Sequence, residues 1–237
     1  MAEFDITRET VIPDSVASAE RIGAFLRAAY GWMCAGLTIT AVTAWYVASS
    51  PRLVVTIAKS GPLFFGLIIA QLGIVFVLSA RVQRLSASTA SALFIGYSVL
   101  TGITLSFVML AYTGETLAST FVVAAGMFGA MAAYGTVTGR SLTGWGQFLF
   151  MGLVGVVLAS VVGLFWQNDG LQFVTCFIGV IVFTGLAAYD AQRLKAMALM
   201  TSAGNTGSYA IVGALALYLD FVNLFLMLLR LLGGRRR

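Results

Sequence analysis

The sequence predicts an all-α polytopic membrane protein with seven transmembrane helices. Of its 237 residues, 59% are hydrophobic and only 10% are charged, whereas a typical soluble domain carries about 25% charged residues. Its apolar segments are long enough for a helix to cross a hydrocarbon core of about 30 Å. The strands of an outer-membrane barrel would instead appear as alternating segments of about 10 residues. Composition and segment length together exclude a soluble globular domain and favour a helical membrane bundle.

Residues 1–29 are expected to form a polar tail followed by an amphipathic helix. Acidic and basic residues are mixed over residues 1–14, as is typical of a flexible terminus. From Ser15 onward, apolar residues such as Phe25 and Leu26 recur near helical spacing. This pattern predicts a lead-in helix at the membrane interface that continues into the first span.

Seven predicted spans then follow one another, and no linker or shift in composition divides them. We therefore expect residues 30–232 to form a single transmembrane domain, with residues 233–237 as a basic C-terminal tail. Pro51 and Pro62 flank the connection between the first two spans. The predicted spans are Tyr30–Ser49, Leu63–Ala80, Ser91–Tyr112, Leu117–Val137, Gly146–Trp166, Leu171–Tyr189 and Ile211–Leu232.

The basic residues between the spans predict a cytoplasmic amino terminus, because Lys and Arg are enriched in cytoplasmic loops. The terminal arginines 235–237 oppose this orientation, which leaves open that the last segment re-enters the membrane without crossing it. No apolar core of a cleaved signal peptide precedes Tyr30. We expect the inner (plasma) membrane of a bacterium, with an endomembrane as the alternative. The residues on the cytoplasmic side are Arg8, Arg21, Arg27, Arg81, Arg84, Arg140, Arg193 and Lys195.

Several chemistries are excluded by residue types that are missing. The chain has no histidine, which removes Ser-His and Cys-His catalysis and histidine metal ligation. Its two cysteines, Cys34 and Cys176, lie in apolar segments and are expected to pack as small apolar side chains. No EF-hand or phosphate-binding loop is found, so we expect no cofactor, no enzymatic activity and no nucleic-acid partner. Transport, if any, should be passive.

The last span carries a carboxylate near its middle. Asp220 lies about ten residues into the apolar segment, where a charge costs several kcal/mol unless it is paired, neutralised or hydrated. Small and polar residues share its helical face, so this face should line the protein interior or a water-filled cavity, with Leu219 on the other side. The residues of the face are Gly213, Ala216, Asp220, Asn223 and Met227.

A second carboxylate, Asp190, ends the predicted sixth span, and Arg81 ends the second span on the same side. A short sixth span would leave Asp190 about 15 Å from the depth of Asp220. The gap closes if this span continues through the apolar residues 196–200. Structural roles remain open for each residue. Asp190 can pair with Arg193 or Lys195, and Asp220 can be a buried, protonated hydrogen-bonding group. Arg81 and Arg84 can be ordinary loop charges, and Arg230 can anchor its helix at the membrane–water interface. Asn223 can form a hydrogen bond across helices.

The segments around the two carboxylates, residues 183–192 and 217–225, resemble the Bax inhibitor-1 family, also called the transmembrane Bax inhibitor motif family. The similarity extends from about Phe25 to Leu232. Weaker agreement is found in Phe25-Leu26-Arg27, in Gly96-Tyr97-Ser98, and in Leu142-Thr143 with Gly146-Gln147-Phe148-Leu149.

This resemblance implies six helices wrapped around a central seventh, and a pH-sensitive passive calcium leak. It implies that Asp190 and Asp220 form a hydrogen-bonded sensor pair that also binds calcium weakly and transiently. Arg81 most resembles the family's arginine that latches the closed state, and Arg230 its late arginine in the last span. The implied partners are the lipid bilayer, calcium ions and protons, with a membrane protein as a further partner. Some bacterial members carry an acidic residue in span two, where this chain has Ala70-Gln71.

Two other functions are compatible with the motifs. An intramembrane aspartyl protease also places a Tyr-Asp and a second Asp on neighbouring helices. However, Leu217–Asp220 lacks the Gly-x-Gly-Asp motif of that family. The family also needs a Pro-Ala-Leu motif, and no proline follows Pro62 in this chain. A membrane regulator that restrains a protease or an apoptotic partner is the second alternative. Calcium flux through the purified protein in liposomes, without any partner, distinguishes a leak from a regulator.

Overall fold

The structure is a computed structural model that describes residues 14–166, 168–200 and 206–233. The predicted polar tail and the C-terminal arginines therefore fall outside the described residues. No strand occurs within them, and seven of the helices are long and apolar enough to cross a membrane, as predicted. The elements are α1 (Asp14–Ala48), α2 (Pro51–Lys59), α3 (Gly61–Ala80), the 3₁₀ turn η1 (Val82–Arg84), α4 (Ala87–Ala111), α5 (Gly114–Val137), α6 (Thr143–Phe165), α7 (Asp169–Met200) and α8 (Thr206–Leu232).

The short helix α2 was not predicted, because its sequence is not apolar enough to stand out beside the spans. Pro51 starts α2 and Pro62 lies in the first turn of α3. Proline suits the beginning of a helix because its missing N–H would have no partner there. The two prolines therefore start two helices. Of the nine residues in α2, only Ile57 is buried.

Three helices differ informatively from the predicted spans. The lead-in segment and the first span form one continuous helix, α1. Helix α7 continues to Met200, ten residues beyond Asp190, so that Asp190 lies within the helix and not at its end. Helix α8 has 27 residues, or about 40 Å at 1.5 Å per residue, which favours full crossing over re-entry.

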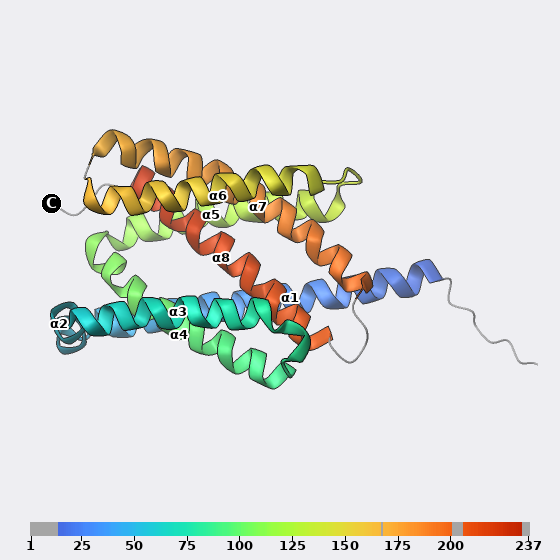
Figure 1. The fold of residues 1–237 in the computed structure, drawn as a ribbon, viewed down its shortest axis with the longest axis horizontal. Helices are drawn as coiled ribbons and strands as arrows, with labels where there is room; N and C mark the ends of the chain where they lie inside the picture. Colours follow the sequence, from blue (N-terminus) through green and yellow to red (C-terminus); the bar gives the residue numbers. More distant parts are fainter. Residues whose placement is uncertain (1–13, 167, 201–205, 234–237) are drawn as a thin grey trace, which may run out of the picture.

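Helix α8 lies between two groups of three helices (Figure 1). One group consists of α1, α3 and α4, and the other of α5, α6 and α7. Within its apolar window, 67% of the residues of α8 are buried, against 6% in α3. The predicted arrangement of six helices around the last is thus confirmed, with one refinement. Helix α6 packs mainly on α7 and reaches α8 least of the six.

Glycines set the closest helix contacts of the second group. A Cβ atom on Gly135 of α5 would overlap the backbone carbonyl of Ala188 in α7. Small residues at such crossings allow two backbones to approach closely in a membrane. Because Ala188 lies two residues before Asp190, this contact fixes the position of the Asp190 segment of α7 against α5.

Replacing Gly135 with alanine is expected to lower the midpoint of thermal unfolding of the purified protein in detergent. Overpacking a tight contact typically costs about 1–3 kcal/mol. Gly126→Ala is the matched control, since Gly126 is exposed on the same helix and a Cβ there meets nothing. Alanine is better than glycine in a helix by about 1 kcal/mol, so the control should be unchanged or more stable. Equal midpoints for the two variants would contradict the close α5–α7 contact.

Candidate functional site

The side chains of Asp190 in α7 and Asp220 in α8 are in hydrogen-bond contact. Asp220 is only 6% exposed, and its Oδ2 atom receives no hydrogen bond from an amide, hydroxyl or guanidinium group. Two carboxylates cannot hydrogen-bond unless one of them carries a proton. The contact therefore fits a pair of carboxyl groups that share one proton; the sensor role that the family resemblance implies for this pair stays a prediction.

Small residues bring α7 and α8 close enough for this contact. Ala187, Ala191 and Ala214 are completely buried. Gly213 faces Leu194, whose side chain occupies the place that a Cβ on Gly213 would take. Such residues provide van der Waals packing between helices where lipid supplies no hydrophobic driving force. Extension of α7 beyond the predicted Tyr189 supplies Leu194, and with it the second half of this interface.

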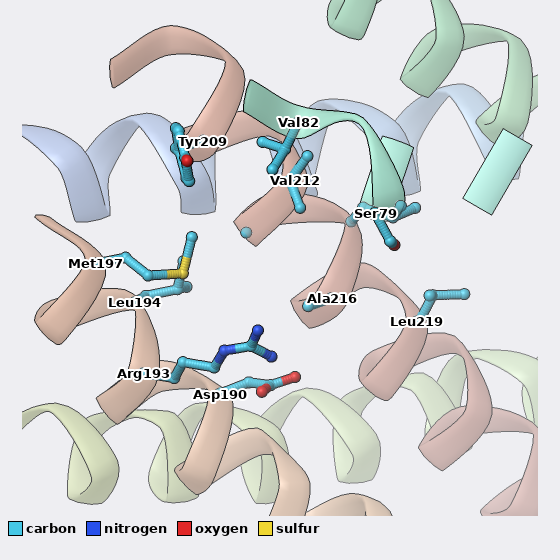
Figure 2. Close-up of a pocket in the computed structure, with 12 residues that line it drawn as sticks. Ser79, Val82, Asp190, Arg193, Leu194, Met197, Tyr209, Val212, Ala216 and Leu219 are labelled. Atoms are coloured by element: carbon cyan, nitrogen blue, oxygen red, sulfur yellow. The ribbon is translucent and has the colours of Figure 1, made fainter. Parts of the chain in front are cut away.

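Asp190 lies at a pocket of about 360 Å³ between α3, η1, α7 and α8. Figure 2 shows Asp190 and Arg193 projecting from α7 towards the α8 side of this pocket, near Ala216 and Leu219. The guanidinium of Arg193 interacts electrostatically with the Asp190 carboxylate. Asp190 is half-buried and Arg193 is exposed, so the pocket gives access to Asp190, while the buried Asp220 does not line it.

Arg81 lies close to this pocket but is not paired with Asp190. It is exposed at the end of α3, and its neighbours Ser79 and Val82 line the pocket. Within the part of the chain that the structure describes, the cation that acts on Asp190 is Arg193. Arg84 is also exposed, at the end of η1. An Arg81 latch therefore stays a prediction, and it requires the Arg81 side chain to turn into the pocket.

Arg230 lies far from the carboxyl pair. It follows Asp220 by ten residues in α8, or about 15 Å along the helix. It lines a separate polar hollow of about 320 Å³ at the other end of α7, together with Asp169, Gln172 and Cys176. The structure thus does not bring this arginine to the two carboxyl groups.

The other residues of the predicted polar face of α8 have different surroundings. Gly213 and Ala216 line the pocket with Asp190. Asn223 donates to the backbone oxygen of Leu219 at 2.8 Å within its own helix, and not across helices. Leu219 also lines the pocket, so its assignment to the opposite side of the helix was wrong. The pocket curves around α8 and reaches beyond one row of small residues.

Comparison with known proteins shows which family this chain belongs to. Residues 22–237 match the family model described as "Inhibitor of apoptosis-promoting Bax1". The chain belongs to the Bax inhibitor-1 family. Among curated relatives, "Inner membrane protein YbhL" of Escherichia coli (strain K12) is 51% identical over 90% of this chain and 92% of its own length. Uncharacterized proteins of Deinococcus radiodurans and Borreliella burgdorferi are 42% and 41% identical. They cover 91% and 90% of the chain, and 93% and 92% of their own lengths, respectively. With its seven apolar helices, this Bax inhibitor-1 protein is an integral inner membrane protein.

A second buried polar cluster in this Bax inhibitor-1 protein was missed in the sequence. The Oγ1 atom of Thr40 in α1 donates to the backbone oxygen of Ser98 at 2.9 Å. It lies 2.6 Å from the hydroxyl of Tyr218. Because the threonine proton is already used, Tyr218 must be the donor. Tyr218 is two residues before Asp220, so one short segment of α8 is tied to α7 and also to α1. Thr40 in the middle of an apolar span was the available signal, but its partners are far away in sequence.

Two further side chains hold α7 in place, and their roles were also missed. The amide of Gln192 accepts from the backbone N–H of Leu142 at 2.7 Å and donates to the oxygen of Arg140 at 2.8 Å. The ammonium of Lys195 donates to the oxygen of Thr136 at 3.1 Å. These contacts satisfy backbone groups at the end of α5 and in the α5–α6 connection. They anchor the segment of α7 around Asp190 to the helix group that contains it.

Cysteine labelling can test the course of the pocket around α8. Cysteines at Ala216 and Leu219 should react with a water-soluble maleimide, because both positions line the pocket. A cysteine at Leu217, which is completely buried, should react at least about tenfold more slowly, given the rarity of local opening in a packed core. The rates can be followed by the mass increase of each variant in a background that lacks Cys34. Protection of all three positions would mean that the carboxyl pair lies in a dry core.

Proposed function

We propose that this protein is a pH-sensitive passive calcium leak of the inner membrane, gated by Asp190 and Asp220. The observation that carries this proposal is the contact between these two carboxyl groups beside a pocket that opens from the bundle. A structural hydrogen bond alone would not require a cavity at the pair. Family membership supports a membrane channel or regulator.

The proton on the carboxyl pair acts as the gate. While it is present, a charge-assisted hydrogen bond joins α7 to α8 and keeps the two helices together. When it leaves, two negative charges about 4 Å apart repel each other by about 4 kcal/mol at an effective dielectric constant of 20. The helices then separate at this point, so calcium flux should rise with increasing pH. Arg193 is the charged group that interacts with the pair; Tyr209 lines the same pocket away from Asp190, and Arg81 and Arg84 are exposed at the adjacent ends of α3 and η1.

Calcium would be held only weakly on its way. The ion prefers six to eight oxygen ligands, and the two carboxylates supply part of such a shell with water completing it. Within the described residues, no cluster of three or more acidic or cysteine side chains offers a tighter site. Weak binding suits a leak, because an ion must leave its site as readily as it enters.

We also propose that the amino terminus and the pocket face the cytoplasm. The amino-terminal part of α1, the end of α3 and the end of α7 carry Arg27, Arg81 and Arg193, respectively. In a seven-span topology these segments lie on one side, and a basic excess marks the cytoplasmic side.

The direct test is calcium flux into liposomes that contain the purified protein and a trapped calcium-sensitive dye, with no partner protein present. We expect flux, measured between about pH 6 and 8, to exceed that of protein-free liposomes and to rise with pH as the shared carboxyl proton is lost. The Asp190→Asn/Asp220→Asn double variant is the control for the pair. Absence of flux at every pH would refute the leak and leave a regulator of a partner protein as the function.

Arg81→Ala is expected to raise the resting leak at about pH 8, where an ionised Asp190 would otherwise be available to the arginine. If the latch stabilises the closed state by about one or two kcal/mol, removing it changes the ratio of closed to open protein about tenfold. Arg84→Ala is the matched control and should have a smaller effect. If Arg84→Ala raises the leak and Arg81→Ala does not, Arg84 is the latch; if neither variant changes the leak, there is none.

A further inference from the structure

A long apolar groove runs between α1 and α5 on the side of α8 away from the carboxyl pair. It consists of two hollows of about 610 and 370 Å³. Both hollows are lined by Leu37, Phe121 and Phe221, so they are continuous. Helices α1 and α5 belong to different helix groups and pack little against each other. The floor of the groove is therefore α8, between the two groups.

The groove stays open because its rims carry small side chains. Cys34 and Ala41 on α1, and Ala125, Gly129 and Ala133 on α5, are exposed along it. A Cβ added to Gly129 would meet nothing within 4 Å. The floor is aromatic, with Phe221 and Phe225 from α8. An apolar hollow on the lipid-facing perimeter of a membrane protein has acyl chains as its immediate surroundings.

One end of the groove is polar and basic. Tyr30 of α1 hydrogen-bonds the side chain of Thr136 in α5, which bridges the two rims. Lys195 donates to the backbone oxygen of the same Thr136. Arg27 lies one turn before Tyr30, and Arg140 follows the end of α5, both exposed. At the opposite end, Gly114 lines the groove and is followed by the acidic Glu115.

We propose that this groove binds one acyl chain of an anionic phospholipid whose headgroup lies at the basic end. The α1 residues of the groove extend from Tyr30 to Ala44, or about 21 Å at 1.5 Å per residue. This length suits a single extended chain that starts at one surface of a hydrocarbon core of about 30 Å. A transmembrane helix of a partner is about 10 Å wide with its side chains and would be obstructed by the Tyr30–Thr136 bridge, whereas a single acyl chain is thin enough to enter the groove beside it. Electrostatic attraction of basic residues selects the anionic headgroup.

The position of the groove gives the bound chain direct contact with α8. Phe221 lines both hollows and is adjacent to Asp220 in the chain. Phe121 of α5 packs edge-on against Phe221 and Phe225, with ring centroids 5.4 and 6.4 Å apart. An acyl chain in the groove would complete the packing of these rings on their lipid side. Acyl-chain binding here does not depend on whether the protein conducts calcium.

The test is photo-crosslinking of the full-length protein in nanodiscs of phosphatidylethanolamine and phosphatidylglycerol. The probe is a phosphatidylglycerol that carries a diazirine in the middle of one acyl chain. We expect crosslinked peptides from α1 around Cys34 and from α5 around Gly129. Gly129→Trp should lower this labelling about tenfold, the effect of losing about 1.4 kcal/mol of binding. Gly126→Trp is the matched control, because Gly126 is also exposed on α5 with open space around it but does not line the groove.

A second pair of variants guards against misfolding of the first. Ala133→Trp should also reduce the labelling, and Ala130→Trp, exposed on α5 outside the groove, should not. Equal labelling of groove and control variants would overturn the proposal. So would efficient oxidative crosslinking of Cys34 between two copies in the membrane, which would assign the groove to a second copy of the chain. Equal labelling by a diazirine phosphatidylethanolamine would overturn the anionic headgroup.

Discussion

Replacing Asp220 with asparagine is expected to remove most of the pH dependence of calcium flux measured between about pH 6 and 8, because the variant has no shared carboxyl proton to lose. Asp220 is buried and Asp190 is the group in hydrogen-bond contact with it. Asparagine keeps the shape and supplies a permanent N–H donor for Asp190, so the contact no longer needs a proton. The variant should therefore behave at every pH like the protonated wild-type protein, with low flux throughout. The measurement is dye-reported calcium entry into liposomes across this pH range.

Asp190→Asn should produce the same flattening, since either residue can carry the shared proton. Asp169→Asn is the control, because Asp169 lies at the opposite end of α7 beside Arg230. Its removal should leave the pH profile of flux unchanged. A wild-type profile in both Asp190→Asn and Asp220→Asn would show that the pair is structural and that another group senses pH.

Replacing Arg193 with glutamine is expected to move the pH midpoint of calcium flux upward. The positive charge of Arg193 acts on the Asp190 carboxylate and favours its ionised form. Without this charge the carboxyl pair keeps its proton to a higher pH, and the helices separate later in a titration. The exposed position of Arg193 limits the effect, because solvent screens its charge.

Lys195→Gln is the matched control for Arg193→Gln. It removes one positive charge from the same helix, but the Lys195 ammonium is directed to the backbone oxygen of Thr136. The pH midpoint should therefore stay within a few tenths of a unit of wild type, as expected for a more distant, screened charge. A downward shift in Arg193→Gln, or equal shifts in the two variants, would contradict a direct effect of Arg193 on Asp190.

The sequence was sufficient for the carboxyl pair because two independent features agreed. A carboxylate in mid-membrane needs a partner, and the motifs around Asp190 and Asp220 resembled a known family. The conflict in depth between the two residues disappeared once α7 continued to Met200, as the apolar residues 196–200 allowed. The hydrophobic pattern indicates only where α7 could end. The contacts of α7 with α5, such as Gly135 against Ala188 and Lys195 with Thr136, are not visible in that pattern.

The identity of the nearby cation could not be predicted to the same degree. Arg193 is three residues after Asp190 and so shares its helical face, which was recognised only as a structural alternative. Arg81 was favoured by topology, but its side-chain direction depends on how α3 ends at η1. Leu219 was misplaced because a helix that is buried all round has no single interior face. The Tyr218–Thr40 contact joins residues 178 positions apart, beyond the reach of any local pattern.

The central place of α8 has a consequence for biosynthesis, since this helix leaves the ribosome after the six helices that surround it. Until then, α1 with α4 and α5 with α7 can associate in the bilayer, but the seam that α8 fills remains lined by lipid. The hydroxyl of Thr40 and the carboxyl of Asp190 would both lack their α8 partners at that stage. Inserted helices find one another by packing and hydrogen bonding, so assembly is completed in a single late step. A chain that stalls before α8 should present exposed polar groups inside the membrane, which makes it a natural substrate for membrane proteases.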